Sequence, residues 1–125
     1  MRTIIAGSRS EKNYDDVLMA VQNAGWKPTL VLSGCANGAD TLGEMWAQNN
    51  HIPVKHYRAD WTNYGQRAGY LRNEVMAENA DALIAIWDGE SKGTKHMIDI
   101  ARRKGLKVYV FNTSIPTLEK PYDHI

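Results

Sequence analysis

The sequence predicts an α/β protein with a parallel, doubly wound sheet, and three observations lead to this prediction. Short apolar runs recur along the chain, as expected of strands that are buried on both faces of a sheet. Most of these runs are followed by a loop of small and polar residues and then by a segment with helical periodicity. Strands that alternate with helices indicate parallel βαβ units with right-handed crossovers. We therefore expect a single Rossmann-like doubly wound domain of about five parallel strands with helices on both faces.

The first half of the chain supplies three of the expected strands, at residues 3–6, 29–32 and 53–57. A helix is expected from about 13 to 23, ending near Gly25. Its inward face follows helical spacing and consists of Val17, Ala20, Val21 and Ala24. A second helix, from about 39 to 49, is expected to bury Leu42, Met45 and Trp46.

The second half continues the same alternation after a gap. Residues 58–66 are polar and without periodicity, so we expect an irregular segment there. A helix from about 67 to 79 is expected to face inward with Leu71 and Val75. A strand at 82–87, a helix at 94–104 and a strand at 107–111 follow. Residues 1–125 thus form one expected domain, with a folded part of about 2–111 and a C-terminal tail at 112–125.

Two loops of small residues are the principal candidate sites, because ligands of such sheets bind beyond the carboxyl ends of the strands. Each loop precedes a helix, whose first N–H groups and dipole attract an anion such as a phosphate. The candidates in the first loop are Ser33, Gly34, Gly38, Ala39 and Asp40. The candidates in the second loop are Asp88, Gly89, Ser91, Gly93 and Thr94. The alternative is that the glycines only form tight turns and that Thr94 only caps a helix.

Three further segments supply candidates. The loop after the first expected strand begins with Gly7, Ser8 and Arg9. Arg72 and Asn73 lie on the helical face away from Leu71 and Val75, where an arginine can hold a phosphate or carboxylate with two hydrogen bonds, or be simply solvated. Trp61 lies in the irregular segment. Its ring is suited to stacking on a nucleobase, and equally to filling the core or an oligomer contact.

Asp40, Asp60 and Asp88 each follow a strand closely enough to reach the crevice, where a carboxylate can bind a ribose hydroxyl group or act as a general base. For the alternative of a hydrolase, the candidate catalytic residues are Asp40, Asp88 and Glu90. Aspartates in such loops also cap helices and turns. Cys35 precedes a helix, where the pKa of a thiol tends to fall, but no base lies near it in the sequence. The 4 histidines show no metal-ligand spacing with cysteine or carboxylates. We therefore expect no metal and no cofactor.

The charge balance limits the classes of partner. Lys and Arg total 15 against 14 Asp and Glu, a net charge of +1, which weighs against a protein that coats nucleic acid. The single cysteine excludes an internal disulfide and suits a reducing compartment. No apolar run approaches the ~20 residues of a membrane span, and the first residues follow a strand pattern rather than that of a signal peptide. We expect a cytoplasmic protein without a membrane partner.

Several fragments, taken together, resemble one family. They are residues 6–9, Ser33-Gly34, residues 38–40, Trp46-Ala47, Asp60-Trp61, Tyr64-Gly65, Ala68-Gly69, Arg72-Asn73, Met76, Asp88-Gly89, Ser91 and Gly93-Thr94. The combination resembles the SLOG superfamily, in particular its YspA-like branch, single-domain relatives of the DprA recombination mediators and the LOG phosphoribohydrolases. The resemblance covers roughly residues 2–111 and implies a Rossmann-like domain that senses or processes nucleotides or nucleotide-derived ligands. It implies ligand contacts at residues 7–9, 33–40, 72–73 and 89–94, and its pattern includes Trp61.

One departure from the family concerns catalysis. The LOG enzymes carry P-G-G-x-G-T-x-x-E, whose glutamate is taken as catalytic together with an arginine. This sequence lacks the proline and has Met97 at the position of that glutamate, whereas Arg72 is retained. The departure argues against cleavage of an N-glycosidic bond by the LOG mechanism.

We interpret the chain as a module that binds a nucleotide or nucleotide-derived signalling ligand, in order to sense it or to sequester it. Sequestration would suit a phage protein that acts against nucleotide-signalling defence. The alternative from another class is a hydrolase of the N-glycosidic bond of a nucleoside phosphate. Nucleic-acid binding by analogy with DprA is a third interpretation, which the near-neutral charge disfavours. We also expect a homo-oligomer, with a contribution from Ile115 and Leu118 of the tail.

Overall fold

Five parallel strands form one sheet, in the order β3-β2-β1-β4-β5, in the computed structural model, which describes residues 1–114. The elements along the chain are β1 (Arg2–Gly7), α1 (Tyr14–Ala24), β2 (Leu30–Ser33), α2 (Ala39–Asn49), β3 (Val54–His56), α3 (Trp61–Tyr64), the 3-10 turn η1 (Gly65–Arg67), α4 (Ala68–Glu78), β4 (Ala82–Trp87), α5 (Lys92–Arg103) and β5 (Lys107–Asn112). The predicted fold class is confirmed. Ile115 and Leu118, the expected oligomer contacts, lie outside the described residues.

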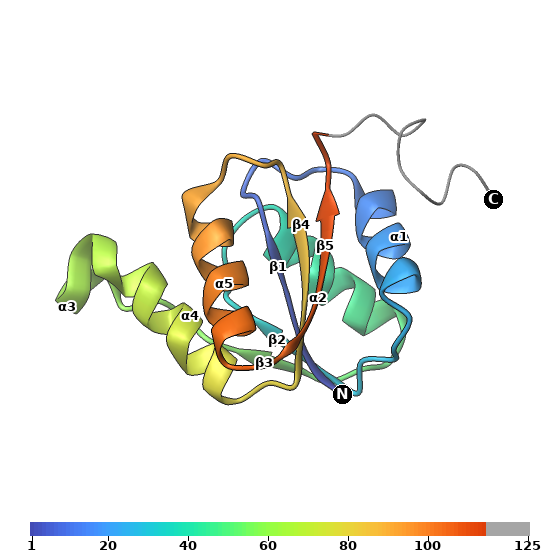
Figure 1. Cartoon of the computed structure of the whole chain (residues 1–125), viewed down its shortest axis with the longest axis horizontal. Coiled ribbons are helices and arrows are strands. Elements are labelled where there is room, and N and C mark those ends of the chain that lie inside the picture. The colour runs from blue at the N-terminus through green and yellow to red at the C-terminus, as the bar shows by residue number, and fades with distance from the viewer. Residues whose placement is uncertain (115–125) are drawn as a thin grey trace.

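Both faces of the sheet are covered by helices, α4 and α5 on one face and α1 and α2 on the other (Figure 1). Consecutive residues of a strand point to opposite faces, so Ile4 packs with the α4–α5 layer and Ile5 with the α1–α2 layer. Both isoleucines are 0% exposed. This burial on both faces is the reason that β1 and β4 are uninterrupted apolar runs in the sequence.

The strand order places the ends of β1 and β4 at the centre of the sheet. Gly7, the last residue of β1, is paired with Ile86 of β4, and the N–H of Ser8 still donates to the carbonyl of Ile86 at 3.0 Å. From this point the chain continues from β1 through α1 to β2 on one side, and from β4 through α5 to β5 on the other. A crevice opens where connections diverge in this way. None of the helices within residues 1–114 is long and apolar enough to span a bilayer.

The expected inward faces of α2 and α4 are each wrong at one residue, whereas Trp46 of α2 is buried as expected. Met45 on α2 and Val75 on α4 were expected to point inward, and each is 45% exposed. On α2 the rotation is set by Gly43, where a Cβ would lie 2.7 Å from a side-chain atom of Ile5. On α4 the buried face consists largely of small or polar residues, Ala68, Gly69, Asn73, Met76 and Ala77. Hydrophobicity alone therefore predicts that Val75 is buried, although it lies on the solvent-exposed side of α4.

The segment expected to be irregular contains a short helix. Asp60 caps α3, because its Oδ1 accepts a hydrogen bond of 3.2 Å from the N–H of Asn63. The 3-10 turn η1 then leads directly into α4. A single helical turn is too short to produce a visible hydrophobic period. The helix α5 also begins two residues earlier than expected, at Lys92.

Candidate functional site

A cavity of about 400 Å³ lies at the carboxyl ends of β1 and β4, between α4 and the start of α5. It collects most of the binding residues that the sequence predicts: Gly7, Ser8, Arg9, Asp40, Trp61, Arg72, Asn73, Asp88, Ser91, Gly93 and Thr94. A second cavity of about 360 Å³ includes Gly34 and shares Arg9, Trp61 and Arg72 with the first. The expected residues that line neither cavity are Ser33, Gly38, Ala39, Gly89 and Glu90.

The loop between β4 and α5 is held in shape by one aspartate. Asp88 Oδ1 accepts hydrogen bonds of 2.8 Å from the N–H groups of Glu90 and Ser91. These two bonds hold the pKa of Asp88 below its usual value, and the bond from the N–H of Ser91 has the larger effect. The N–H of Asp88 donates to Ser8 Oγ at 3.1 Å, which ties this loop to the one after β1. Asp88 is thus engaged in supporting the loop.

The first turn of α5 is open toward the cavity. Its N-cap residue, Ser91, makes no capping hydrogen bond with its side chain, and instead Ser91 Oγ lies 3.1 Å from Thr94 Oγ1. Ser91, Gly93 and Thr94 all line the cavity. Thr94 is therefore not the N-cap that the alternative interpretation expected. Amides of a first helical turn and two hydroxyl groups together form a site for an anion.

The start of α2 is closed by the chain itself. The N–H of Ala39 donates to the carbonyl of Ser8 at 3.1 Å. Gly38 adopts a φ of 77°, and a Cβ there would lie 2.4 Å from the carbonyl oxygens of Ser8 and Arg9. Ser33 and Ala39 are 0% exposed. The residues of this loop that line neither cavity therefore hold the loop in place, and Asp40 is the member of the group that reaches the first cavity.

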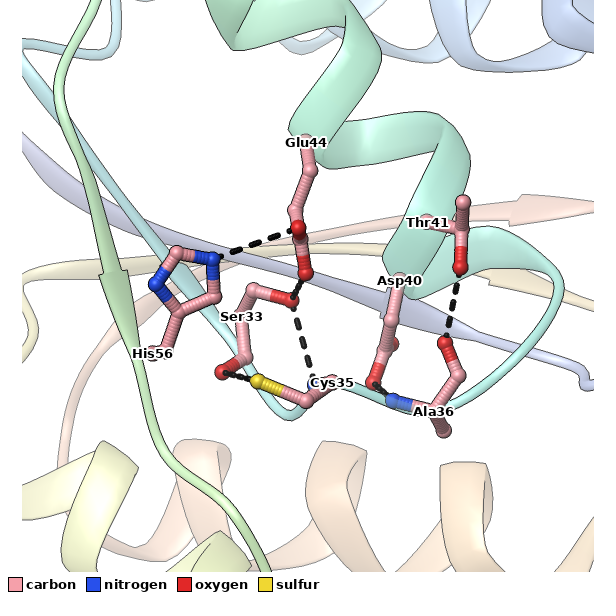
Figure 2. A network of polar contacts seen from close by, with 7 residues as sticks. All are labelled: Ser33, Cys35, Ala36, Asp40, Thr41, Glu44 and His56. Carbon is pink, nitrogen blue, oxygen red and sulfur yellow. Dashed lines mark hydrogen bonds and ion pairs between the residues drawn. The ribbon is translucent and has the colours of Figure 1, made fainter.

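Asp40 brings a buried carboxyl group to the cavity. The residue is 6% exposed, and its Oδ2 accepts a hydrogen bond of 3.1 Å from the N–H of Ala36 (Figure 2). Burial raises the pKa of Asp40 to about 6, against the opposing effects of the Ala36 N–H and of the charge of Arg72. A carboxyl group with this pKa exchanges its proton near neutral pH.

Arg72 and Asn73 form a fixed pair on the buried side of α4. Arg72 donates from Nη1 to the carbonyl of Gly34 at 2.5 Å and from Nε to Asn73 Oδ1 at 3.2 Å. Asn73 Nδ2 donates to the carbonyl of Gly93 at 3.3 Å and lies 3.2 Å from His96 Nδ1. Burial lowers the pKa of Arg72, and the nearby Asp40 opposes this effect. The pair connects α4 with the loop after β2 and with the first turn of α5.

Aromatic rings border the cavity on the side of α3 and α4. Trp61 is 49% exposed, and the guanidinium carbon of Arg9 lies 5.7 Å from the centre of its ring. Tyr70 stacks on His96 with ring centres 4.2 Å apart, and burial lowers the pKa of that histidine. The cavity thus has cationic groups, hydroxyl groups, the carboxyl groups of Asp40 and Asp88 and an exposed indole in its lining.

Comparisons with known proteins identify the family. The model of the YspA, cpYpsA-related SLOG family, YAcAr, matches residues 1–64. The Gene 61 protein of Mycobacterium phage D29 is 33% identical over 119 residues, which cover 88% of this chain and 95% of that protein. The chain belongs to the YAcAr family. This YAcAr chain also shares its fold with the DNA processing protein A (DprA) of Streptococcus pneumoniae, at a TM-score of 0.69 and 17% identity. That match covers 87% of the chain and 49% of the DprA chain, so the chain spans about half of that protein.

The residue at which this YAcAr chain differs from the LOG pattern, Met97, lies in the lining of the cavity. Met97, which the resemblance places at the position of the LOG glutamate, is 1% exposed. Its thioether has no proton to exchange. Of the three candidate carboxylates, Asp88 supports its own loop, Glu90 lies outside both linings, and Asp40 is buried in the first.

Several lining residues of this YAcAr site were not predicted. They are Ala6, Ser10, Gln66, Gly69, Tyr70, Met76 and Met97 in the first cavity, and Arg58 and Ala59 in the second. Cys35, Ala36 and Asn37 also line a cavity, and they belong to the segment 33–40 in which the resemblance implies ligand contacts. Met76 had a usable signal, because it follows Arg72 by one helical turn and so shares its face. The other positions depend on how the loops fold over the sheet, which periodicity does not encode.

Proposed function

We propose that this YAcAr protein binds a nucleotide or nucleotide-derived ligand in the cavity between β1, β4 and α4. One observation carries the proposal: an open helix start, two arginines, a buried carboxyl group and an exposed tryptophan line the same cavity. Membership of a SLOG family and the DprA-like fold support a nucleotide-related role. A ligand with a phosphate, a sugar and a base has a group for each of these features.

The phosphate is assigned to the start of α5. Amides of the first turn and the hydroxyl groups of Ser91 and Thr94 are available there. The corresponding amide of α2 is already bonded to Ser8, and the carboxyl group of Asp40 would repel an anion at that end. We therefore place the phosphate at one helix start rather than at both.

The sugar and base occupy the rest of the cavity. Asp40, which lines the cavity from the first turn of α2, suits a ribose hydroxyl group, because a carboxylate accepts hydrogen bonds from such groups. Trp61 suits the base, since an exposed indole offers a face for stacking and Arg9 already lies over it. One relative is a phage protein, and our proposal includes sequestration of the ligand in an infected cell as one role of the binding.

A second candidate function, hydrolysis of an N-glycosidic bond, is favoured by one observation. The pKa of Asp40 is raised to about 6, which suits a general acid or base. In such a reaction water adds to the anomeric carbon and the departing base takes up a proton. Because Met97 stands where the resemblance places the LOG glutamate, Asp40 would have to act without that second carboxylate and from a different position in the cavity.

Thermal-shift measurements against nucleotides, cyclic dinucleotides and ADP-ribose derivatives test the proposal, with each stabilising compound then incubated and chromatographed. We expect a compound that raises Tm and is recovered intact. Recovery of a free base and a sugar phosphate would instead establish the hydrolase. No stabilisation by any member of the panel, with binding to single-stranded DNA that weakens with salt, would contradict both and favour the DNA-related role.

A further inference from the structure

Three side chains with metal-binding atoms lie close together where the loop after β2 approaches α2 and β3. Cys35 comes from this loop, Glu44 from α2 and His56 from the end of β3 (Figure 2). One ligand atom of each, the thiol sulfur, a carboxylate oxygen and an imidazole nitrogen, lies within 4.8 Å of the other two. The sequence predicts no metal site because these residues belong to three different elements and form no local spacing.

We propose that Cys35, Glu44 and His56 bind a Zn²⁺ ion. A thiolate, an imidazole and a carboxylate are all ligands that Zn²⁺ accepts, whereas Mg²⁺ and Ca²⁺ take oxygen ligands. His56 Nε2 lies 3.3 Å from Glu44 Oε1. Tetrahedral zinc with bonds of ~2.0–2.1 Å to nitrogen and oxygen separates these two atoms by about 3.4 Å. The pair is therefore already spaced as ligands of one ion.

The residue behind this cluster holds two of the ligands in place. Ser33 is 0% exposed, and its Oγ donates to Glu44 Oε2 at 2.5 Å. The same oxygen accepts a hydrogen bond of 3.2 Å from the N–H of Cys35. Glu44 Oε1 is left to face His56. Hydrogen bonds from an outer residue to the ligands are a regular feature of metal sites.

The backbone of Cys35 is held in an uncommon conformation. Its φ is 65°, in the left-handed region that glycine adopts at lower cost. Arg72 bonds to the carbonyl of the preceding Gly34 and so anchors the turn. The thiol lies 3.6 Å from the carbonyl of Ser33, and this contact is given up when the thiol loses its proton to bind metal.

The site is accessible and incomplete. The side chains of His56 and Glu44 are 42% and 30% exposed, so an ion can reach them from solvent. Three protein ligands leave one tetrahedral position for water or for an oxygen of another molecule. Cys35 also lines the second cavity, beside Asn37 and Arg58. The inference is independent of the proposed nucleotide site.

Titration of the full chain with Co²⁺ tests the proposal, in protein without a polyhistidine tag and with a reductant that is not a thiol. We expect one Co²⁺ per chain with a sulfur-to-cobalt charge-transfer band, and displacement of that ion by Zn²⁺. Because Cys35 is the single cysteine, the band reports on it alone, and Cys35→Ser abolishes it. We expect Zn²⁺ affinity to fall at least ~10-fold in Glu44→Gln and His56→Gln, and about 10-fold in Ser33→Ala.

Two variants serve as matched controls, His51→Gln and Glu78→Gln, which replace an imidazole and a carboxylate outside the cluster and leave affinity unchanged. Circular dichroism of each variant without metal confirms that it is folded. A folded wild-type chain that gives no charge-transfer band would overturn the proposal. So would a band and an affinity that persist unchanged in both Glu44→Gln and His56→Gln, since the thiol would then bind cobalt without its neighbours.

Discussion

The loops after β2 and after β4 have similar compositions, but the first is packed against the chain and the second borders a cavity. Each combines glycines, a hydroxyl group and an aspartate close to the start of the following helix. In the first loop the leading amide of α2 is bonded to Ser8, and Gly38 is packed against carbonyl oxygens. In the second, the first turn of α5 opens on a cavity. A helix start is an anion site only where the rest of the chain leaves its amides unoccupied.

The two aspartates differ in the same way. Asp40 is buried, and its pKa is raised to about 6. Asp88 accepts two N–H hydrogen bonds at the surface, and its pKa is lowered. Burial without a full set of donors therefore makes one carboxyl group a proton-exchanging group, while donors make the other a structural cap.

The largest difference between the two loops is expected in the effect on stability of replacing one glycine of each, Gly38 or Gly93. Gly38→Ala should lower the free energy of unfolding by about 3 kcal/mol or more, because the φ of 77° is unfavourable for alanine and the new Cβ would lie 2.4 Å from two carbonyl oxygens. Gly93→Ala meets nothing within 4 Å and lies in a helix, so it should stabilise by ~0.5–1 kcal/mol. Urea unfolding of both variants measures the two changes in the free energy of unfolding. Equal changes would contradict the difference in packing between the two loops.

The second difference is in pH dependence. The folded pKa of Asp40, about 6, lies above the ordinary value of 3.8, so the contribution of Asp40 to stability is fully present below pH 3.8 and is lost as pH rises through 6. Between pH 4 and pH 8 the unfolding free energy of the wild type should therefore fall, relative to that of Asp40→Asn, by up to about 3 kcal/mol. Urea unfolding across this range gives the difference, and parallel curves would mean that Asp40 titrates normally.

Asp88 should show the opposite dependence with a smaller amplitude. Asp88→Ala removes the acceptor for two amides and should lower the free energy of unfolding by about 1 kcal/mol at pH 7. Because the folded pKa is depressed, this stabilisation is present above the usual pKa of the group and is lost as pH falls through the folded value. The same unfolding series measures it; a loss that persists in full at low pH would argue against this role.

The smallest expected effect concerns the ligand. Thr94→Val removes a hydroxyl group from the open helix start and should weaken binding of a phosphorylated ligand ~5-fold, about 1 kcal/mol. Thr41→Val is the matched change on α2, where Thr41 Oγ1 donates to the carbonyl of Ala36 at 3.1 Å within the chain. It should leave affinity unchanged. Calorimetry with the stabilising compound from the thermal-shift panel distinguishes the two, and a larger loss in Thr41→Val would reverse the assignment.

The fold could be predicted from the sequence because strands buried on both faces are uninterrupted apolar runs, as at Ile4 and Ile84. That residues of several candidate loops line one cavity could also be expected from the sequence, because each of these loops follows a parallel strand. Which helix start is open could not be predicted, since it depends on a bond between Ser8 and Ala39, from different loops. The inward side of α4 was missed because Asn73 is buried there through bonds to Gly93 and Arg72, and no hydrophobicity pattern represents those bonds.

The position of β1 in the middle of the sheet has a consequence for synthesis of the chain. Thr3 pairs with Val31 on one side and with Ala82 on the other. A nascent chain that has not yet reached β4 therefore has its most buried strand at an unprotected edge, with Ile4 and Ile5 on it. In the finished sheet β1 has a neighbour on each side, and the second of these neighbours, β4, is synthesised only from Ala82 onward, so the order of synthesis leaves this apolar edge for the last part of the chain to cover.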